Sequence, residues 1–313
     1  MNISVIIPNY NGEQIIVKNL PKVLSAIEEY DKGKSEIIIS DDLSTDRSVE
    51  IIEKIISENK NSKVSIKLLK NEKNKGFSSN VNRGVGESNG EILILLNTDV
   101  IPAKGFLRPL LQHFSDDKIF AVGCLDESLE NGKIIHRGRG IGKWKKGFLI
   151  HSAGTHDKND TLWVSGGSGA FRKEIWDKLK GLDEIYNPFY WEDIDLSYRA
   201  LKSGYKTVFE KDSIVRHEHD KGVIKKKFKP NWVKKIVYRN QFIFAWKNSD
   251  LSNLLRNILW MPYQFITTII SGDFPMIFGF FDALILLPKI IRSRITAQKY
   301  FVKSDQEVIN SIK

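Results

Sequence analysis

The chain has 313 residues, of which 41% are hydrophobic and 27% charged, so it has room for one large α/β domain and an appendage. Cys124 is the only cysteine, which excludes a disulfide framework and a thiolate metal cluster and fits a reducing compartment. The net charge is +10, but residues 221–313 hold 16 Lys/Arg and 5 Asp/Glu, a net of +11, whereas residues 1–220 hold 32 and 33. A nucleic-acid binder would carry its excess charge more evenly, so we expect no nucleic-acid partner.

Strand-like and helical runs alternate through the first hundred residues. Strands are expected at Ile3–Ile7, Glu36–Ile39, Val64–Leu69 and Glu91–Leu96, and helices at Gln14–Glu29, Val49–Glu58 and Ser78–Ser88. This alternation with short loops predicts βαβ units, and hence an α/β fold with a mainly parallel sheet flanked by helices. The first strand begins without a basic leader or a long apolar run, so we expect no secretory signal.

Polar clusters follow three of the predicted regular segments directly, at residues 8–12, 41–46 and 97–99. Ligands of parallel sheets bind beyond the carboxyl ends of the strands. We therefore expect these three clusters to line one crevice.

The pattern loosens after Asp99. Residues 126–161 are polar and rich in Gly, Lys and His, and their weak periodicity predicts a long active-site loop. Further on we expect a strand over Leu162–Phe171, interrupted by Gly166, Gly167 and Gly169. A helix is expected over Glu192–Leu201, and two more strands over Thr207–Phe209 and Ile214–His217.

Three groups of residues have the chemistry of a metal or catalytic site. Asn97 and Asp99 follow an apolar strand. Asp99 is suited to bind a hard cation that also binds a diphosphate. The alternative is a local turn, in which Asn and Asp side chains bond the backbone. His217 is either a structural histidine or a metal ligand beside carboxylates.

The third group is acidic. Glu192, Asp193 and Asp195 lie within four residues at the start of a predicted helix. Acidic residues there complement the helix dipole, which is the default explanation. However, crowding raises the pKa of one of a set of carboxylates, and a raised pKa suits a general base that accepts a hydroxyl proton.

Seven segments in order resemble the motifs of family 2 glycosyltransferases of the GT-A fold. They are Val5–Gly12, Ile37–Asp46, Asn74–Phe77 with Asn82–Gly84, Leu95–Asp99, Gly181–Glu184, Glu192–Leu196 and Val215–His217. The resemblance covers residues 1–220 and is greatest to bacterial rhamnosyl- and galactofuranosyl-type transferases that build surface polysaccharides. It implies a GT-A catalytic domain over residues 1–220.

The resemblance also implies roles for single residues. Donor-binding positions are Pro8, Asn9 and Tyr10 beside the nucleotide, Asp41 or Asp42 at the base or ribose, Asn74, Gly76 and Phe77 in the donor pocket, and Asn82 and Arg83 near the diphosphate. Asn97 and Asp99 occupy the DxD-type metal position, His217 that of an extra metal or diphosphate ligand, and Asp193, paired with Glu192, that of the catalytic base. Two residues depart from the pattern: Asn97 replaces an acidic residue, and Leu43 replaces a small one.

The implied activity is an inverting, metal-dependent transfer with Mg²⁺ or Mn²⁺. The donor would be a dTDP- or UDP-sugar, and the acceptor a hydroxyl of a cell-surface polysaccharide or a lipid-linked glycan. Two alternatives stay open: a nucleotidyltransferase acting on sugar phosphates, although residues 8–12 lack its basic phosphate loop, and a catalytically inactive glycan-binding homologue. A dinucleotide-dependent oxidoreductase is disfavoured because no GxGxxG follows the first strand.

Residues 221–313 form a basic and apolar tail. Its apolar runs are Phe242–Trp246, Ile258–Ile270 and Phe274–Ile291, each short of a bilayer span or broken by Asp and Pro. We expect an amphipathic helical extension lying on an anionic membrane surface, which would make the protein cytoplasmic and peripheral on the inner face of the cytoplasmic membrane. The alternative is a helix pair that packs on the catalytic domain or in a homodimer interface.

Overall fold

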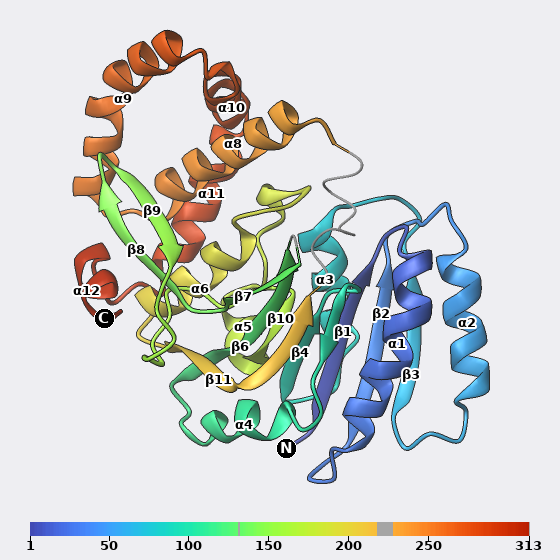
Figure 1. Cartoon of the computed structure of the whole chain (residues 1–313). Coiled ribbons are helices and arrows are strands. Elements are labelled where there is room, and N and C mark those ends of the chain that lie inside the picture. The colour runs from blue at the N-terminus through green and yellow to red at the C-terminus, as the bar shows by residue number, and fades with distance from the viewer. Residues whose placement is uncertain (131, 218–227, 313) are drawn as a thin grey trace.

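The computed structural model describes residues 1–130, 132–217 and 228–312. Its centre is a nine-stranded sheet in the order β3-β2-β1-β4-β10-β6-β11-β5, with β7 paired to β6. Helices cover both faces of the sheet, and the C-terminal helices form a further layer beside one end of it (Figure 1). The predicted α/β fold is confirmed.

The N-terminal half of the sheet is parallel, as predicted. Its elements are β1 (Ile3–Asn9), α1 (Glu13–Glu28), β2 (Ser35–Asp41), α2 (Ser48–Glu58), β3 (Ser65–Lys70), α3 (Phe77–Gly86) and β4 (Ile92–Leu96). All five residues of β4 are buried because both faces of the sheet are covered. Ile92, Ile94 and Leu96 pack in the core with α1 and α2. Leu93 and Leu95 pack in the opposite core with α3.

The second half of the sheet mixes strand directions. It contains β5 (Val100–Pro102), β6 (Ile119–Glu130), β7 (Lys133–Arg137), β10 (Ser168–Arg172) and β11 (Lys206–His217), with α4 (Leu107–Gln112), α5 (Lys173–Lys178) and α6 (Glu192–Lys202). β10 runs antiparallel to both β4 and β6, so β6 runs in the direction of β4, and β11 is parallel to β6. The two strands expected at 207–209 and 214–217 are one strand, β11, with an irregularity between Glu210 and Ile214.

The prediction of a long loop at residues 126–161 was wrong. The segment completes β6 and contains β7 and a separate hairpin, β8 (Gly140–Lys145) with β9 (Phe148–Ala153). The sequence here does not show the alternation of apolar and polar residues that marks a strand, because β7 exposes nearly all of its residues and β8 mixes Gly with Lys. The strand expected over Leu162–Phe171 is also shorter, since β10 begins at Ser168 and the glycine segment before it is irregular.

The C-terminal helices pack on the preceding part of the chain through α8 and α12. The helices are α8 (Pro230–Asn248), α9 (Leu251–Ser271), α10 (Phe274–Ile285), α11 (Leu287–Gln298) and α12 (Asp305–Asn310). A third core joins Phe242 and Phe244 of α8 and Val308 of α12 to Tyr198 of α6 and Leu149 of β9. The first apolar run of the tail is therefore interior to the protein.

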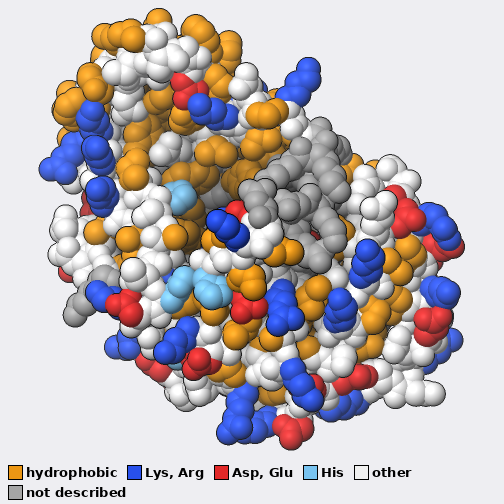
Figure 2. Space-filling model, in the orientation of Figure 1, with side chains coloured by type: hydrophobic (Ala, Val, Ile, Leu, Met, Phe, Trp, Pro, Cys, Tyr) orange, Lys and Arg blue, Asp and Glu red, His pale blue; other side chains and the backbone are white. Residues whose placement is uncertain are grey.

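The other two apolar runs are largely exposed. Leu259 and Ile270 of α9 keep 76% and 81% of their surface in solvent, and Ile285 at the end of α10 keeps 78%. Figure 2 shows such side chains gathered over α9 and α10 at the top of the molecule. Among the described residues, no single helix is long and apolar enough to cross a membrane. The consecutive helices α10 and α11 together have the length and composition of a membrane span, but they are bent by 70° relative to each other.

Candidate functional site

The sheet topology brings the predicted site residues to one edge. β1, β2, β4, β6 and β11 all run in the same direction, so their carboxyl ends meet there. Asn9 and Asp41 close β1 and β2, Asn97 follows β4, and His217 closes β11. β10 enters from the same edge, because it is antiparallel to β4, and the oxygen of Gly167, directly before β10, accepts a hydrogen bond from the Asn97 nitrogen at 2.9 Å.

Asn9 and Asp41 form a buried polar pair at the start of the crevice. The Asn9 amide donates to Asp41 at 2.7 Å, and Asp41 also accepts from the Ser44 hydroxyl and backbone at 2.5 and 2.9 Å. The Asn9 oxygen is buried without a hydrogen-bond partner among the described residues. Pro8 and Tyr10 flank Asn9 and are half-buried. This pair fixes the loop after β2, where Leu43 has a φ of +64°, a conformation that favours glycine.

Asp42 organises the loop that leads into α3. Its carboxylate accepts from the backbone nitrogens of Lys75 and Gly76, both at 2.9 Å, and its backbone oxygen accepts from the Asn74 amide at 3.1 Å. Phe77 then begins α3. Asp42, Asn74, Gly76 and Phe77 are thus brought together, and Asp42 positions the loop through its own hydrogen bonds, while the donor-binding role of these residues stays a prediction.

Asn82 and Arg83 are engaged in protein contacts. The Asn82 amide donates to the Leu182 oxygen at 2.7 Å and accepts from the Leu182 nitrogen at 3.1 Å. Arg83 donates to the Lys70 oxygen at 2.6 Å and to the Asn71 side chain. These contacts tie α3 to neighbouring segments, and the diphosphate role of both residues stays a prediction.

Asp99 and His217 meet at this edge, and a third residue, Asp126, joins them. β5 pairs with β11 so that Val100 lies opposite His217. His217 Nε2 is 3.1 Å from Asp99 Oδ2, and Nδ1 is 3.1 Å from Asp126 Oδ2. Although burial opposes the charged form, these two carboxylates raise the pKa of His217 to about 9. Asp126 lies in the segment that the sequence predicted to be a loop, so sequence reasoning missed it.

A hard divalent cation fits this donor set once it displaces the proton that the two carboxylates stabilise on His217. Two ligands at right angles around such a cation, with bonds of about 2.1 Å, lie about 3 Å apart, close to the Asp99–His217 separation. Asp126 on Nδ1 would fix the ring and its tautomer, as carboxylates behind metal-bound histidines do. No three His, Cys, Asp or Glu side chains among the described residues converge on one point. The described residues offer such a cation two ligands, Asp99 and His217.

The predicted catalytic carboxylates open α6 on unusual backbone. Tyr190 and Trp191, directly before the helix, both have positive φ, at +72° and +76°. Such residues are costly and cluster at functional sites. Glu192 is buried, and one of its oxygens has no partner among the described residues. Burial, together with the charge of Asp193, raises the pKa of Glu192 well above its usual range.

Asp193 is half-buried and faces the glycine segment before β10. Its Oδ2 lies 3.4 Å from the Gly166 nitrogen, and a Cβ on Gly166 would lie 3.6 Å from that of Asp193 and 3.5 Å from the Phe77 ring. Burial raises the pKa of Asp193. The segment 166–167 therefore links the start of α6 to Phe77 on one side and to Asn97 on the other.

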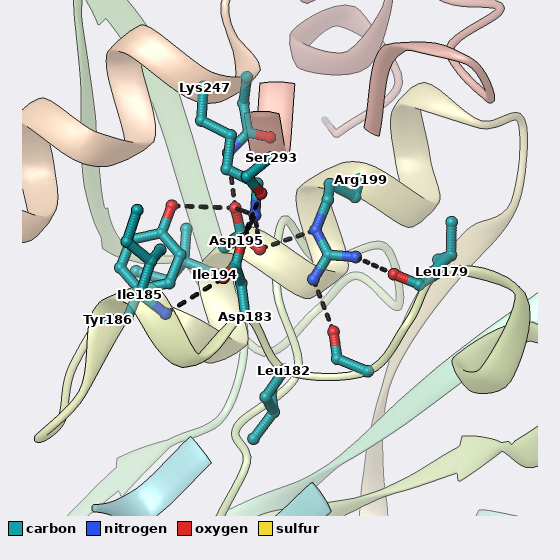
Figure 3. Close-up of polar contacts among 12 residues, drawn as sticks. Leu179, Leu182, Asp183, Ile185, Tyr186, Ile194, Asp195, Arg199, Lys247 and Ser293 are labelled. Carbon is teal, nitrogen blue, oxygen red and sulfur yellow. Dashed lines mark hydrogen bonds and ion pairs between the residues drawn. The ribbon is translucent and has the colours of Figure 1, made fainter. Parts of the chain in front are cut away.

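Asp195 has a different role from its two neighbours. Its carboxylate is fully buried and bonds Arg199 at 2.7 Å, Lys247 and Asn248 of α8 at 2.9 and 2.7 Å, and the Tyr186 hydroxyl at 2.9 Å. Figure 3 shows this cluster with Asp183, whose side chain bonds Lys247 at 2.6 Å and also Ser293 of α11. The back of α6 is therefore fixed to the C-terminal helices, while Asp193 faces the glycine segment before β10.

Solved structures with this arrangement belong to the GT-A glycosyltransferases. One of them, GalNAc-T7 with UDP, GalNAc and Mn²⁺, matches with a TM-score of 0.62 and 19% identity over 87% of this chain and 57% of that one, which shows the shared fold.

Residues 4–179 match the model of glycosyl transferase family 2, and the chain belongs to this family. The O-antigen chain rhamnosyltransferase RfbN of Salmonella typhimurium is 26% identical over 228 residues, which cover 70% of this chain and 67% of that protein. A Methanococcus voltae enzyme, dolichyl N-acetyl-alpha-D-glucosaminyl phosphate 3-beta-D-2,3-diacetamido-2,3-dideoxy-beta-D-glucuronosyltransferase, is 24% identical over 286 residues, 86% of this chain and 80% of that protein. The predicted family is confirmed, and the protein is a glycosyltransferase.

Proposed function

We propose that this glycosyltransferase moves a sugar from a UDP- or dTDP-sugar to a hydroxyl of a lipid-linked or polysaccharide glycan, with inversion at the anomeric carbon. The observation that carries the proposal is the convergence of Asp99 and His217 with the segment that contacts Asp193, at the carboxyl edge of one sheet. The UDP in the GalNAc-T7 structure and the lipid-phosphate acceptor in the name of the Methanococcus relative support the substrate classes.

Each residue has a definite task in this reaction. Asp193, at the crevice, accepts the proton of the attacking hydroxyl, and its raised pKa makes it a stronger base than an exposed aspartate. Asp99 and His217 hold the diphosphate end, where a divalent cation, when bound, offsets the negative charge of the leaving group. A single base acting on the acceptor supports direct displacement, and hence inversion.

The proposed function is tested by screening UDP-, dTDP- and GDP-sugars for thermal stabilisation of the full-length protein, with and without Mn²⁺. A donor is expected to raise Tm mainly when the cation is present, because ligands that bind only the folded state stabilise it. Slow hydrolysis of the same donor should follow. Stabilisation without hydrolysis would favour the inactive glycan-binding homologue, and release of pyrophosphate from a nucleoside triphosphate and a sugar phosphate would favour the nucleotidyltransferase.

The role of Asp126 gives a sharper test of the metal site. Asp126→Asn should weaken Mn²⁺ binding in the presence of UDP by about 10–100-fold, the usual cost of removing the carboxylate behind a metal-bound histidine. The matched control is Glu127→Gln on the same strand, since Glu127 lies beside Arg216 and His136 instead. Titration calorimetry measures both affinities. Equal affinities for Asp126→Asn and the wild type would remove Asp126 from the site.

A further inference from the structure

Helix α9 is apolar on its outer face and polar on its inner face. Leu255, Leu259, Ile266 and Ile270 are spaced along the exposed side, whereas Asn257 is fully buried. Asn257 accepts a hydrogen bond from the Trp246 indole at 2.9 Å and donates to the Gly147 oxygen at 3.2 Å. This is the reverse of a helix that packs on a protein core and faces water. The outer face of α9 is suited to an apolar surrounding.

Helix α10 continues the same apolar surface. Phe278 is 58% exposed, and Ile285 ends the helix. The one charged residue of α10, Asp282, is paired with Lys235 at 2.7 Å, and the one charged residue of α9 is Arg256. We define the outer face as Leu255, Leu259, Ile266, Ile270, Phe278 and Ile285. An exposed apolar surface of this extent marks an interaction site.

Lysines of the β8–β9 hairpin border this outer face. Lys146 lies with its Nζ 3.9 Å from the centre of the Tyr263 ring and 4.6 Å from that of Trp260, both on α9. The next residue, Gly147, contacts α9 so closely that a Cβ there would meet the Asn257 backbone at 2.1 Å. Lys143 and Lys145 are exposed on the same hairpin. Figure 2 shows Lys and Arg side chains at the left edge of the apolar region, where the hairpin reaches α9.

We propose that the outer face docks on an anionic bilayer surface, with the hairpin lysines against the headgroups. Apolar helix faces bordered by lysines bind in this way, and Trp and Tyr, here Trp260 and Tyr263, favour the boundary between headgroups and chains. A second copy of the chain would present the same lysines to this surface and so would not complement its charge.

Docking in this way brings the protein, and with it the proposed active site, to the bilayer surface. The acceptor is then carried by a lipid of the same bilayer, which deepens the proposed function. The docking itself does not rest on the reaction, because it is measured without donor or acceptor.

The test is flotation of the full-length protein with vesicles of phosphatidylcholine alone and of equal parts phosphatidylcholine and phosphatidylglycerol. The wild type should float with the anionic vesicles and less with the neutral ones. The double variant Ile266→Glu/Ile270→Glu should stay at the bottom with both. Its matched control is Ile134→Glu on β7, an isoleucine that is 63% exposed away from the outer face, which should float like the wild type.

Charge reversal in the hairpin provides a second arm. Lys143→Glu/Lys145→Glu should weaken binding to the anionic vesicles by about tenfold or more, since each lysine near such a surface contributes roughly fivefold. The control is Lys18→Glu/Lys22→Glu on the exposed side of α1. Failure of the wild type to float with anionic vesicles would overturn the proposal. So would a dimer in sedimentation analysis that Ile266→Glu/Ile270→Glu converts to a monomer, because the outer face would then bind a second copy.

Discussion

Replacing Asp193 by Asn is expected to lower the rate of sugar transfer by about 10²–10⁴, the usual contribution of a general base, while donor affinity stays near that of the wild type. The side chain keeps its shape but loses the ability to accept a proton from the acceptor hydroxyl. The neighbouring change, Glu192→Gln, is the matched control. Burial and the charge of Asp193 raise the pKa of Glu192 well above its usual range, which favours the uncharged carboxyl, and a glutamine resembles that form closely.

The pH profile of the wild type follows from the same assignment. A base must be ionised, so kcat/KM should fall as the pH falls through the pKa of Asp193. Since burial raises that pKa, the acid limb should lie above the value of about 3.9 that is usual for aspartate. Steady-state rates of the wild type and the two variants measure both effects. If Glu192→Gln lost more activity than Asp193→Asn, the assignment of the base would have to be exchanged.

Replacing Lys247 by Met is expected to destabilise the whole protein by about 3–5 kcal/mol, the cost of breaking a buried ion pair by removing one partner. Lys247 is 1% exposed and bonds both Asp195 and Asp183. Burial opposes the ionisation of both carboxyls, yet their cationic partners hold both pKa values below the usual range. Without the lysine, the carboxylates of Asp183 and Asp195 stay buried and ionised, and each has lost a cationic partner.

Thermal unfolding measures this change, and a decrease in Tm of about 5–8 °C is expected, since an unfolding entropy of about 2.1 cal/mol/K per residue makes 1 kcal/mol worth about 1.5 °C in a chain of 313 residues. The control Lys289→Met replaces an exposed lysine on α11 and should change stability by less than about 0.5 kcal/mol. Because the folded-state pKa values are lowered, the stabilisation by the cluster is present at neutral pH and is lost as the pH falls through them. A variant that melted with the wild type would show that the cluster contributes little net stability.

The first hundred residues could be predicted closely because three of their strands, β1, β2 and β4, are largely buried. In β4, five consecutive apolar residues allow no other interpretation, and the polar residues that follow it must lie at the edge. The contact of Asp99 with His217 could be inferred only through the family resemblance, since the pairing of β5 with β11 joins segments more than a hundred residues apart. Spacing alone does not encode such a pairing.

Other features of the site left little trace in the sequence. Asp126 was missed because the sequence around it was interpreted as a loop, whereas it lies on strand β6. Its spacing was a usable signal: Cys124, Asp126 and Ser128 alternate along the strand and all three are buried, so the carboxylate faces inward. The separate role of Asp195 depends on Lys247, which lies 52 residues further along the chain. The first apolar run of the tail was predicted to lie on a membrane or, alternatively, to pack on the catalytic domain or in a homodimer interface. It packs on the domain, where aromatic residues of α6 and β9 cover it.

The attachment of α6 to α8 and α11 limits how members of this family can be recombined. A chimera joined near residue 220, where the charge of the chain changes, would take Asp195 and Arg199 from one parent and Lys247 and Ser293 from the other. The helix that carries the base would then rest on a mismatched support. A junction near residue 179, where the family match ends, keeps α6 and the helices that support it from one parent.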